Sequence, residues 1–180
     1  KHMISITNKT LQDLEFTTIL ETISEKCNTE IGKQKALQIV PFKDKETLMD
    51  ALLQTSEYVA SFSNNNTIPN HGFENLTKDI KFLQIEDSFL EVGTFRKLGH
   101  LSETTNFLLK YFQKFDEYYP KLNQKASEVE YTKFIIQKID EVVDKYGEIK
   151  DNASPDLVNI RRNINLVRGK VNQSFGMALS

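Results

Sequence analysis

The sequence has 180 residues, of which 27% are charged and 39% hydrophobic, and its formal net charge is −2. This composition suits one globular domain and is too apolar for a disordered chain. The lack of Trp, with only seven Gly and four Pro, leaves few turn signals for an all-β fold and favours helices. No apolar run approaches the roughly 20 residues that cross a bilayer. We therefore expect no membrane segment. The single cysteine, Cys27, cannot form an internal disulfide, which favours a cytoplasmic protein.

Apolar residues recur at helical spacing along most of the chain, which predicts an all-α fold of about seven helices. Asp44 is a plausible N-cap, and Pro41 and the polar run 63–72 are breaks between helices. The predicted helices span residues 8–27, 30–40, 45–62, 74–83, 91–118, 128–145 and 154–180. In the third helix we expect a buried side made of Leu48, Ala51, Leu52, Thr55, Val59 and Phe62.

Two of these helices are long. The helix at 91–118 carries an apolar seam with alternating steps of three and four residues, as in a heptad repeat, and Pro120 stops it. The seam consists of Leu98, Leu101, Thr105, Leu108, Phe112, Phe115 and Tyr119. The sequence thus predicts a multi-helical bundle in which two long helices dominate.

The last stretch predicts the second long helix. Ser154 can cap the free backbone N–H groups, Pro155 suits the first helical position, and Asp156 faces the positive end of the helix dipole. Behind this start runs an apolar stripe of Leu157, Ile160, Ile164, Val167, Val171 and Ala178. Such a helix cannot bury its stripe against itself. We therefore expect it to lie on the rest of the domain or on sequence beyond Ser180, in a chain cut from a longer protein.

The domain organisation follows from these signals. Residues 1–3, Lys-His-Met, are typical of a cloning remnant ahead of the natural start. We expect residues 4–146 to form a helical core domain. Residues 147–180 then hold a loop and the start of a long helix that the chain does not complete.

No pattern in the chain predicts a catalytic, cofactor-binding or metal-binding residue. His71 and His100 have no partner at metal-ligand spacing. Cys27 closes an apolar helical face, which predicts a small buried hydrophobic residue rather than a nucleophile. The phosphate-binding pattern G-x-x-x-x-G-K-[ST] does not occur. We expect no active site within these residues.

The C-terminal stretch is basic. From Pro155 onward, Arg161, Arg162, Arg168 and Lys170 stand against Asp156. These four basic residues are the candidate nucleic-acid contacts, although a phosphate-tracking surface would group them on one side. On a helical wheel they spread around the helix, and the residues between them are mostly Asn rather than aromatic. This spread favours a solvated helix, with phosphate contact as the alternative.

The run 147–157, Gly-Glu-Ile-Lys-Asp-Asn-Ala-Ser-Pro-Asp-Leu, followed by Ile160-Arg161-Arg162, resembles the segment that leads into the long lever helix of second-type MutS proteins. These proteins are bacterial paralogues of the mismatch-repair ATPase that lack its mismatch-reading domain. The runs at 14–16 and 29–33 are similar to the opening of that family. The middle of the chain, from 72 to 91, matches it more loosely.

The resemblance implies that this chain is the N-terminal helical core and the beginning of the lever. In the family, a clamp, a homodimeric ABC-type ATPase domain that binds ATP and Mg, and often an Smr nuclease module follow. Members are associated with branched DNA and control of recombination, or with rescue of stalled ribosomes. The chain itself is then expected to be no enzyme, and to transmit ATPase-driven motion to the nucleic-acid clamp.

Two rival interpretations stay open. A free-standing helical protein-interaction module could pair its seams with partner helices, and the reading frame beyond Ser180 separates this from the first interpretation. An enzyme would need a deep polar pocket around His71 or His100. The tripeptides Phe89-Leu90-Glu91 and Phe115-Asp116-Glu117 match the Phe-x-Glu wedge of mismatch-reading proteins. Both fall in predicted helical periodicity, and we interpret both as coincidence.

Overall fold

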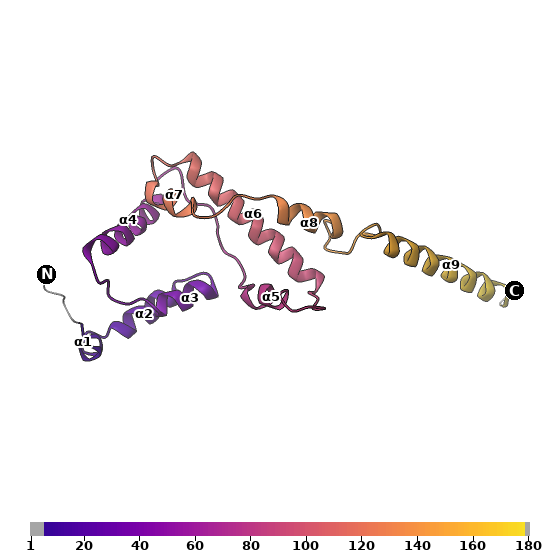
Figure 1. The fold of residues 1–180 in the computed structure, drawn as a ribbon, viewed down its shortest axis with the longest axis horizontal. Coiled ribbons are helices and arrows are strands. Elements are labelled where there is room, and N and C mark those ends of the chain that lie inside the picture. Colours follow the sequence, from indigo (N-terminus) through magenta and orange to yellow (C-terminus); the bar gives the residue numbers. More distant parts are fainter. Residues whose placement is uncertain (1–5, 179–180) are drawn as a thin grey trace.

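The computed structural model of the chain describes residues 6–178, and this part is all-α (Figure 1). Residues 1–3, predicted as a cloning remnant, lie outside the described residues. The only β pairing among the described residues is an isolated antiparallel bridge between Val143 and Ile149. The helices are α1 (Asn8–Asp13), α2 (Phe16–Glu25), α3 (Glu30–Leu37), α4 (Lys45–Ser61), α5 (Thr77–Phe82), α6 (Val92–Lys114), α7 (Pro120–Ala126), α8 (Phe134–Val142) and α9 (Pro155–Ala178).

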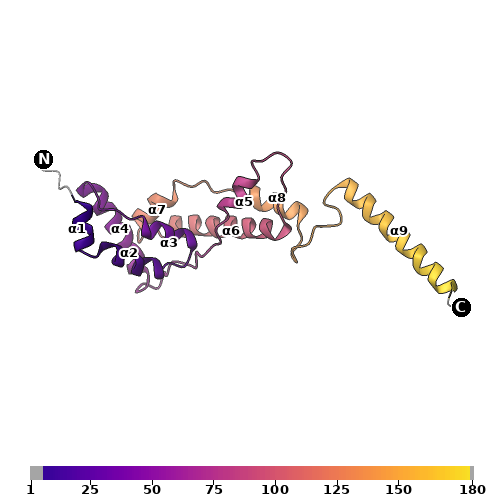
Figure 2. The same ribbon diagram turned by 90° about the horizontal axis from the view of Figure 1, so that it is seen from below.

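The helices pack locally and form an extended molecule. α2 packs on α3, α4 on α7, and α6 on both α7 and α8. α1 and α9 lie at opposite ends in both views, and α9 extends away from the other helices (Figures 1 and 2). The accessible surface is 14,890 Å², whereas a compact protein of this mass exposes about 8,900 Å². Much of the apolar surface is therefore uncovered.

The N-terminal helix predicted at 8–27 is two helices, which helps to bring the number in the described residues to nine rather than seven. Glu15, between α1 and α2, has a φ of 51°, in the left-handed region. A residue in this conformation ends the regular hydrogen-bond ladder of a right-handed helix. Neither Gly nor Pro marks the break. The other predicted helices before α6 exist, with α3 ending at Leu37 and α5 spanning Thr77–Phe82.

α4 begins as predicted, but its buried side differs from the expectation. Asp44 Oδ1 accepts from Thr47 N at 2.8 Å, which confirms the N-cap. The predicted apolar side is largely exposed, with Leu52 at 52% and Phe62 at 66%. α4 instead meets α7 through polar groups on another face, among them an ion pair at 2.6 Å between Asp50 and Lys121. Polar tertiary contacts decide which face of α4 is covered.

α7 is an additional helix that the sequence does not predict, because Pro120 is there a stop signal for the preceding helix. Proline also suits the first position of a helix, where its missing N–H has no partner to lose, and Pro120 is the first residue of α7. The carboxylate of Glu57 on α4 caps this helix from outside. Its Oε1 accepts from Lys121 N and its Oε2 from Leu122 N, both at 2.9 Å. The cap joins α4 to α7.

The seam of α6 continues past the end of the helix. α6 ends at Lys114, so Phe115 and Tyr119 follow it, and Tyr119 is fully buried. The hydroxyls of Tyr111 and Tyr119 both donate to the Asn66 carbonyl, the former at 2.6 Å. Burial, aided by Tyr119, raises the pKa of Tyr111 to about 12. The seam thus fastens the asparagine-rich loop to α6.

α8 packs against α6 and is shorter than the helix predicted at 128–145. Asn106 of α6 is buried, donates to the Thr132 carbonyl at 2.7 Å, and accepts from Thr132 N at 3.3 Å. Gly99 of α6 lies opposite Ile139 of α8, so a methyl group at Gly99 would be 3.6 Å from the isoleucine. These contacts set α8 along α6, next to the start of the loop that leads to α9.

Within residues 6–178, no helix combines the length and apolarity of a membrane span.

Candidate functional site

The root of α9 is a short bridged loop that follows α8. The bridge joins Val143 to Ile149, and Lys150 N donates to the Val142 carbonyl at 2.8 Å. Val143 is one of the few buried apolar residues in the described chain. The bridge therefore ties the entrance of α9 to the end of α8.

A turn inside this loop is held by one carboxylate. Asp144 Oδ1 accepts from Tyr146 N at 2.8 Å and from Glu148 N at 2.9 Å. These backbone hydrogen bonds, chiefly the one from Glu148, lower the pKa of Asp144. Gly147 has a φ of 85°, and a methyl group there would collide with the Arg96 side chain on α6. The turn is thus seated against α6.

Arg161 connects the first turns of α9 to the same loop. Its guanidinium Nη1 pairs with the Asp151 carboxylate, and its Nη2 donates to the Ile149 carbonyl at 3.2 Å. One of the four candidate nucleic-acid contacts therefore has protein partners at the root of the helix. This arrangement gives Arg161 a part in setting the direction in which α9 leaves the loop.

The predicted start of α9 is confirmed. Ser154 Oγ accepts from Leu157 N at 3.2 Å, and Pro155 is the first helical residue. Sequence reasoning found this cap and the loop before it, but missed the hydrogen-bonding role of Asp144. The signal was available in Asp144-Lys145-Tyr146-Gly147, because Asp and Gly at this spacing are typical of turns.

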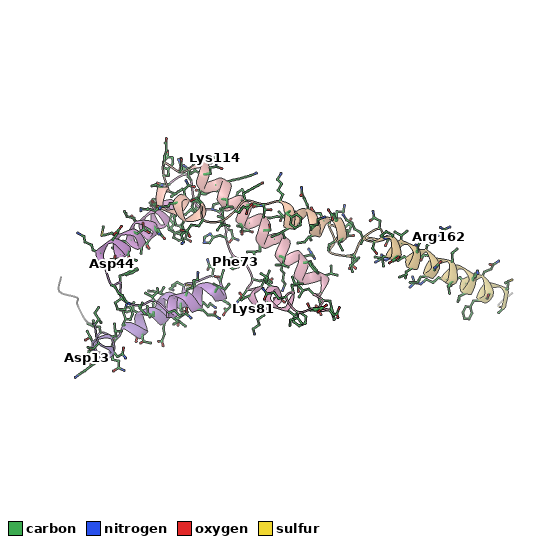
Figure 3. All side chains as sticks on the ribbon, viewed as in Figure 1. Asp13, Asp44, Phe73, Lys81, Lys114 and Arg162 are labelled. Atoms are coloured by element: carbon green, nitrogen blue, oxygen red, sulfur yellow. The ribbon has the colours of Figure 1, made fainter. Side chains whose placement is uncertain are left out.

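Most side chains of α9 are exposed to solvent. None of its described residues is buried, and side chains of the predicted stripe are open, with Ile164 at 45% and Val167 at 59% exposed. Arg162, Arg168 and Lys170 are exposed and form no ion pair with the residues 6–178. Figure 3 shows Arg162 on the part of the molecule that extends from the other helices. Contact of these residues with nucleic acid stays a prediction.

A groove of about 650 Å³ lies beside His100, between α6 and α8. Charged side chains line it, and Lys97 pairs there with Glu74 at 2.5 Å. The hydrogen bond and charge of Glu74 raise the pKa of Lys97. In the described part of the chain, no group of three or more His, Cys, Asp or Glu residues could hold a metal ion.

His71 and Cys27 have local contacts. His71 Nδ1 lies 2.9 Å from the Pro69 carbonyl, and its ring meets Tyr58 edge-on with a centroid distance of 5.8 Å. Cys27 is half-buried rather than fully buried as predicted, and its Sγ lies 3.4 Å from the Ile23 carbonyl. These contacts suit structural roles for both side chains.

The two Phe-x-Glu tripeptides have different settings. Phe115 packs against Tyr111 with a centroid distance of 4.8 Å, as its place on the seam suggests. Phe89 is 81% exposed and lies in the irregular segment before α6. The prediction of a helix is therefore wrong for 89–91, and it is also wrong for 115–117, which form turns after the end of α6. After α5, the chain runs in turns and irregular backbone up to α6, although neither Pro nor Gly marks the end of the helix.

The chain is similar to several curated proteins named "Endonuclease MutS2". It is 30% identical over 165 residues to the "Endonuclease MutS2" of Acetivibrio thermocellus, covering 87% of this chain and 20% of the relative. It is 28% identical over 173 residues to that of Alkaliphilus oremlandii, covering 91% of this chain and 21% of the relative. For Staphylococcus aureus (strain Newman), the values are 26% over 174 residues, covering 93% and 22%. No family profile matches the chain.

The chain spans about a fifth of the length of these curated relatives. The similarity extends over nearly the whole of it, through both the packed helices and α9. This similarity, at 26–30% identity over about 90% of the chain, supports membership of the MutS2 family for the chain, as a part of a protein of that type.

Proposed function

We propose that the chain is the N-terminal helical core and lever base of a MutS2-type nucleic-acid-binding ATPase. The packed helices α4 to α8 form the base, and α9 begins the lever. ATP, with Mg, binds a homodimeric ATPase domain outside these residues and rotates the base. The packed helices of the base shift as a unit rather than bending, and α9, a continuous helix attached to this base, carries the motion to a clamp on nucleic acid.

The observation that carries the proposal is the form of α9. Its 24 residues make a rod of about 36 Å. The rod is held at one end by the Val143–Ile149 bridge and by the pair of Arg161 with Asp151. Beyond this end, it leaves the other helices (Figures 1 and 2). A stiff element fixed at one end suits the transmission of a rotation.

The uncovered surface supports a place within a larger assembly of domains. The excess over a compact protein of this mass, on the order of 6,000 Å², far exceeds the ~800 Å² that one partner contributes to a standard interface. Relatives about five times as long offer much more polypeptide to cover it. We propose that the remainder of the MutS2-type protein packs on the stripe of α9 and on the open face of α4.

The proposed targets are branched DNA, with control of recombination, and stalled ribosomes. The relatives are named endonucleases, and we place any nuclease activity, such as that of an Smr module, outside these residues. The chain itself contributes positioning rather than chemistry.

A free-standing helical interaction module is the alternative proposal. The open apolar face of α4, with Leu52 and Phe62 more than half exposed, favours it. Such a module binds partner helices through this face. It requires neither an ATPase domain nor a nucleotide-dependent movement of α9.

The test uses a full-length MutS2-type protein that carries this chain, with Ile164→Asp in the stripe of α9 and Asn163→Asp on the neighbouring exposed position as control. The stripe variant places a charge where apolar packing is proposed. We expect it to keep ATP hydrolysis and lose nucleotide-dependent binding to branched DNA and to ribosomes, with the control unchanged. Normal nucleotide-dependent binding by Ile164→Asp would refute the proposal.

A further inference from the structure

A second, smaller groove lies where the segment before α8 crosses α6. Its volume is about 320 Å³, at the low end of the range for ligand pockets. Phe107, Tyr131 and Ile136 supply apolar walls, and Lys110, Lys133 and Glu103 supply charged groups. Sequence analysis did not single out these residues, because Tyr131 reaches α6 only through the tertiary fold.

The walls of this groove are fixed in position. Asn106, which is 8% exposed, holds Thr132 through hydrogen bonds in both directions. Phe107 follows this asparagine on α6, and Tyr131 precedes the threonine in the crossing segment. Phe107 is thus held on a helix, and Tyr131 adjoins a residue that a buried polar contact fixes to that helix.

Both aromatic side chains are partly exposed. Phe107 is 57% exposed and Tyr131 is 39% exposed. Five neighbouring aromatic residues pack on one another, namely Tyr111, Phe112, Phe115, Tyr118 and Tyr119. In contrast, neither Phe107 nor Tyr131 packs on another aromatic ring among residues 6–178. An exposed aromatic ring can stack on a planar ligand.

The rim of the groove is positive. Lys110 Nζ lies 5.0 Å from the centre of the Tyr131 ring. Within the described chain, Lys110 and Lys133 have no ion-pair partner, whereas Lys138, one turn on, is paired with Glu141 at 2.8 Å. Glu103 is the only carboxylate among the described residues that line the groove. The local balance is thus positive in a chain of net charge −2.

We propose that this groove binds single-stranded nucleic acid. A base stacks on the rings of Phe107 and Tyr131, and Lys110 and Lys133 contact the flanking phosphates. Aromatic platforms next to amines are the combination that single-strand binding uses, since every base offers a π-face and every linkage a charge. A duplex keeps its bases stacked within the helix, so it cannot place one in the groove.

This surface goes beyond the proposed lever function. It is separate from the four basic residues of α9, which lack interleaved aromatic residues. It needs neither ATP nor movement of α9, so binding here and transmission through α9 can fail independently.

The test measures fluorescence anisotropy of a labelled oligothymidylate of about 20 nucleotides, a length that spans typical single-strand sites. The removal of one stacking ring, in Tyr131→Ala or Phe107→Ala, is expected to lower affinity roughly 5- to 150-fold. Tyr131→Phe keeps the ring and is expected to keep the affinity. Phe89→Ala, at an aromatic residue 81% exposed elsewhere, is the matched control.

Salt dependence tests the lysines. Each of Lys110→Gln and Lys133→Gln is expected to reduce the slope of log affinity against log salt by about 0.7, the value for one phosphate contact with a single strand. Lys26→Gln, at an exposed lysine directly after α2, is the control and is expected to leave the slope unchanged.

A measurement on the unaltered chain guards against variants that fail to fold. In amide NMR spectra, oligothymidylate is expected to shift signals of residues 106–110 and 131–137. Shifts confined to α9, no binding, equal affinity for a duplex of the same length, or equal competition by polyglutamate would each overturn the proposal. Loss of nucleotide-dependent behaviour in the full-length protein would leave it standing.

Discussion

The guanidinium of Arg161 on α9 pairs with the carboxylate of Asp151, ten residues earlier in the loop that precedes the helix. The side chains are 41% and 82% exposed, so solvent screens the pair and its effect on stability is small. The pair instead contributes to the position of α9. The same guanidinium also holds the Ile149 carbonyl, so three points of the root are linked by one side chain.

Arg161→Ala is expected to free the direction of α9 without unfolding the chain. In a Cys27→Ser background, spin labels at positions 137 and 172 report the distance between α8 and α9. We expect a broader distance distribution for Arg161→Ala, with the melting temperature little changed. Arg162→Ala, which removes an exposed guanidinium without an ion-pair partner among residues 6–178, serves as the control and keeps the original width. Equal widths in both variants would contradict the orienting role of Arg161.

Gly147→Ala is expected to destabilise the chain. The left-handed backbone at this position costs a residue with a side chain about 1–2 kcal/mol, and the added methyl group also meets Arg96. The measurement is urea unfolding followed by circular dichroism. Gly169→Ala is the matched control, because a methyl group there meets open space and should stabilise the helix by about 0.5–1 kcal/mol. A Gly147→Ala chain as stable as the original would show that the turn is not held against α6.

The turn at Asp144 is expected to loosen in acid. Backbone hydrogen bonds lower the pKa of Asp144 below 3.8. The contribution of its carboxylate to the stability of the folded chain is therefore fully present above the unfolded-state pKa. It is lost as the pH falls through the lower folded-state pKa. NMR titration of the carboxyl carbon should give a midpoint below 3.8. In Asp144→Asn, the protection of the amides at 146–148, corrected for the intrinsic pH dependence of exchange, should no longer fall in acid. A carboxyl midpoint at or above 3.8 in the original chain would be the contrary result.

Glu57→Ala is expected to weaken the contact between α4 and α7. It removes the acceptor of two backbone N–H groups at the start of α7, and loss of an N-terminal cap costs about 1 kcal/mol. Hydrogen exchange should rise at 121–123 more than elsewhere. Glu21→Ala, at an exposed site on α2, is the control. If Glu57→Ala and Glu21→Ala gave the same exchange rates at 121–123, the cap would be unimportant for α7.

The sequence predicted features that neighbouring residues determine. The caps at Asp44 and Ser154 formed because a side-chain oxygen reaches an N–H three residues later, whatever the rest of the fold does. The two long helices also follow from local periodicity. The break at Glu15 was missed because its left-handed backbone comes from a residue type that seldom adopts it.

Features that depend on tertiary contacts were not predictable in the same way. The covered side of α4 is chosen by Asp50 and Glu57 meeting α7, although the apolar pattern pointed to Leu52 and Phe62. The groove at Phe107 requires contacts between segments 26 residues apart. At the root of α9, the loop was predicted, but the partner of Arg161 was not, because a wheel diagram contains only the helix itself.

The central claim is that α9 transmits movement from a nucleotide-driven base. The most direct measurement is the distance between labels at positions 137 and 172 in a full-length MutS2-type protein carrying this chain, with and without ATP and Mg. The account predicts a shift of the distance distribution with nucleotide, and loss of that shift in Arg161→Ala while ATP hydrolysis continues. An identical distribution in both nucleotide states, in a protein whose nucleic-acid binding still responds to ATP, would contradict it.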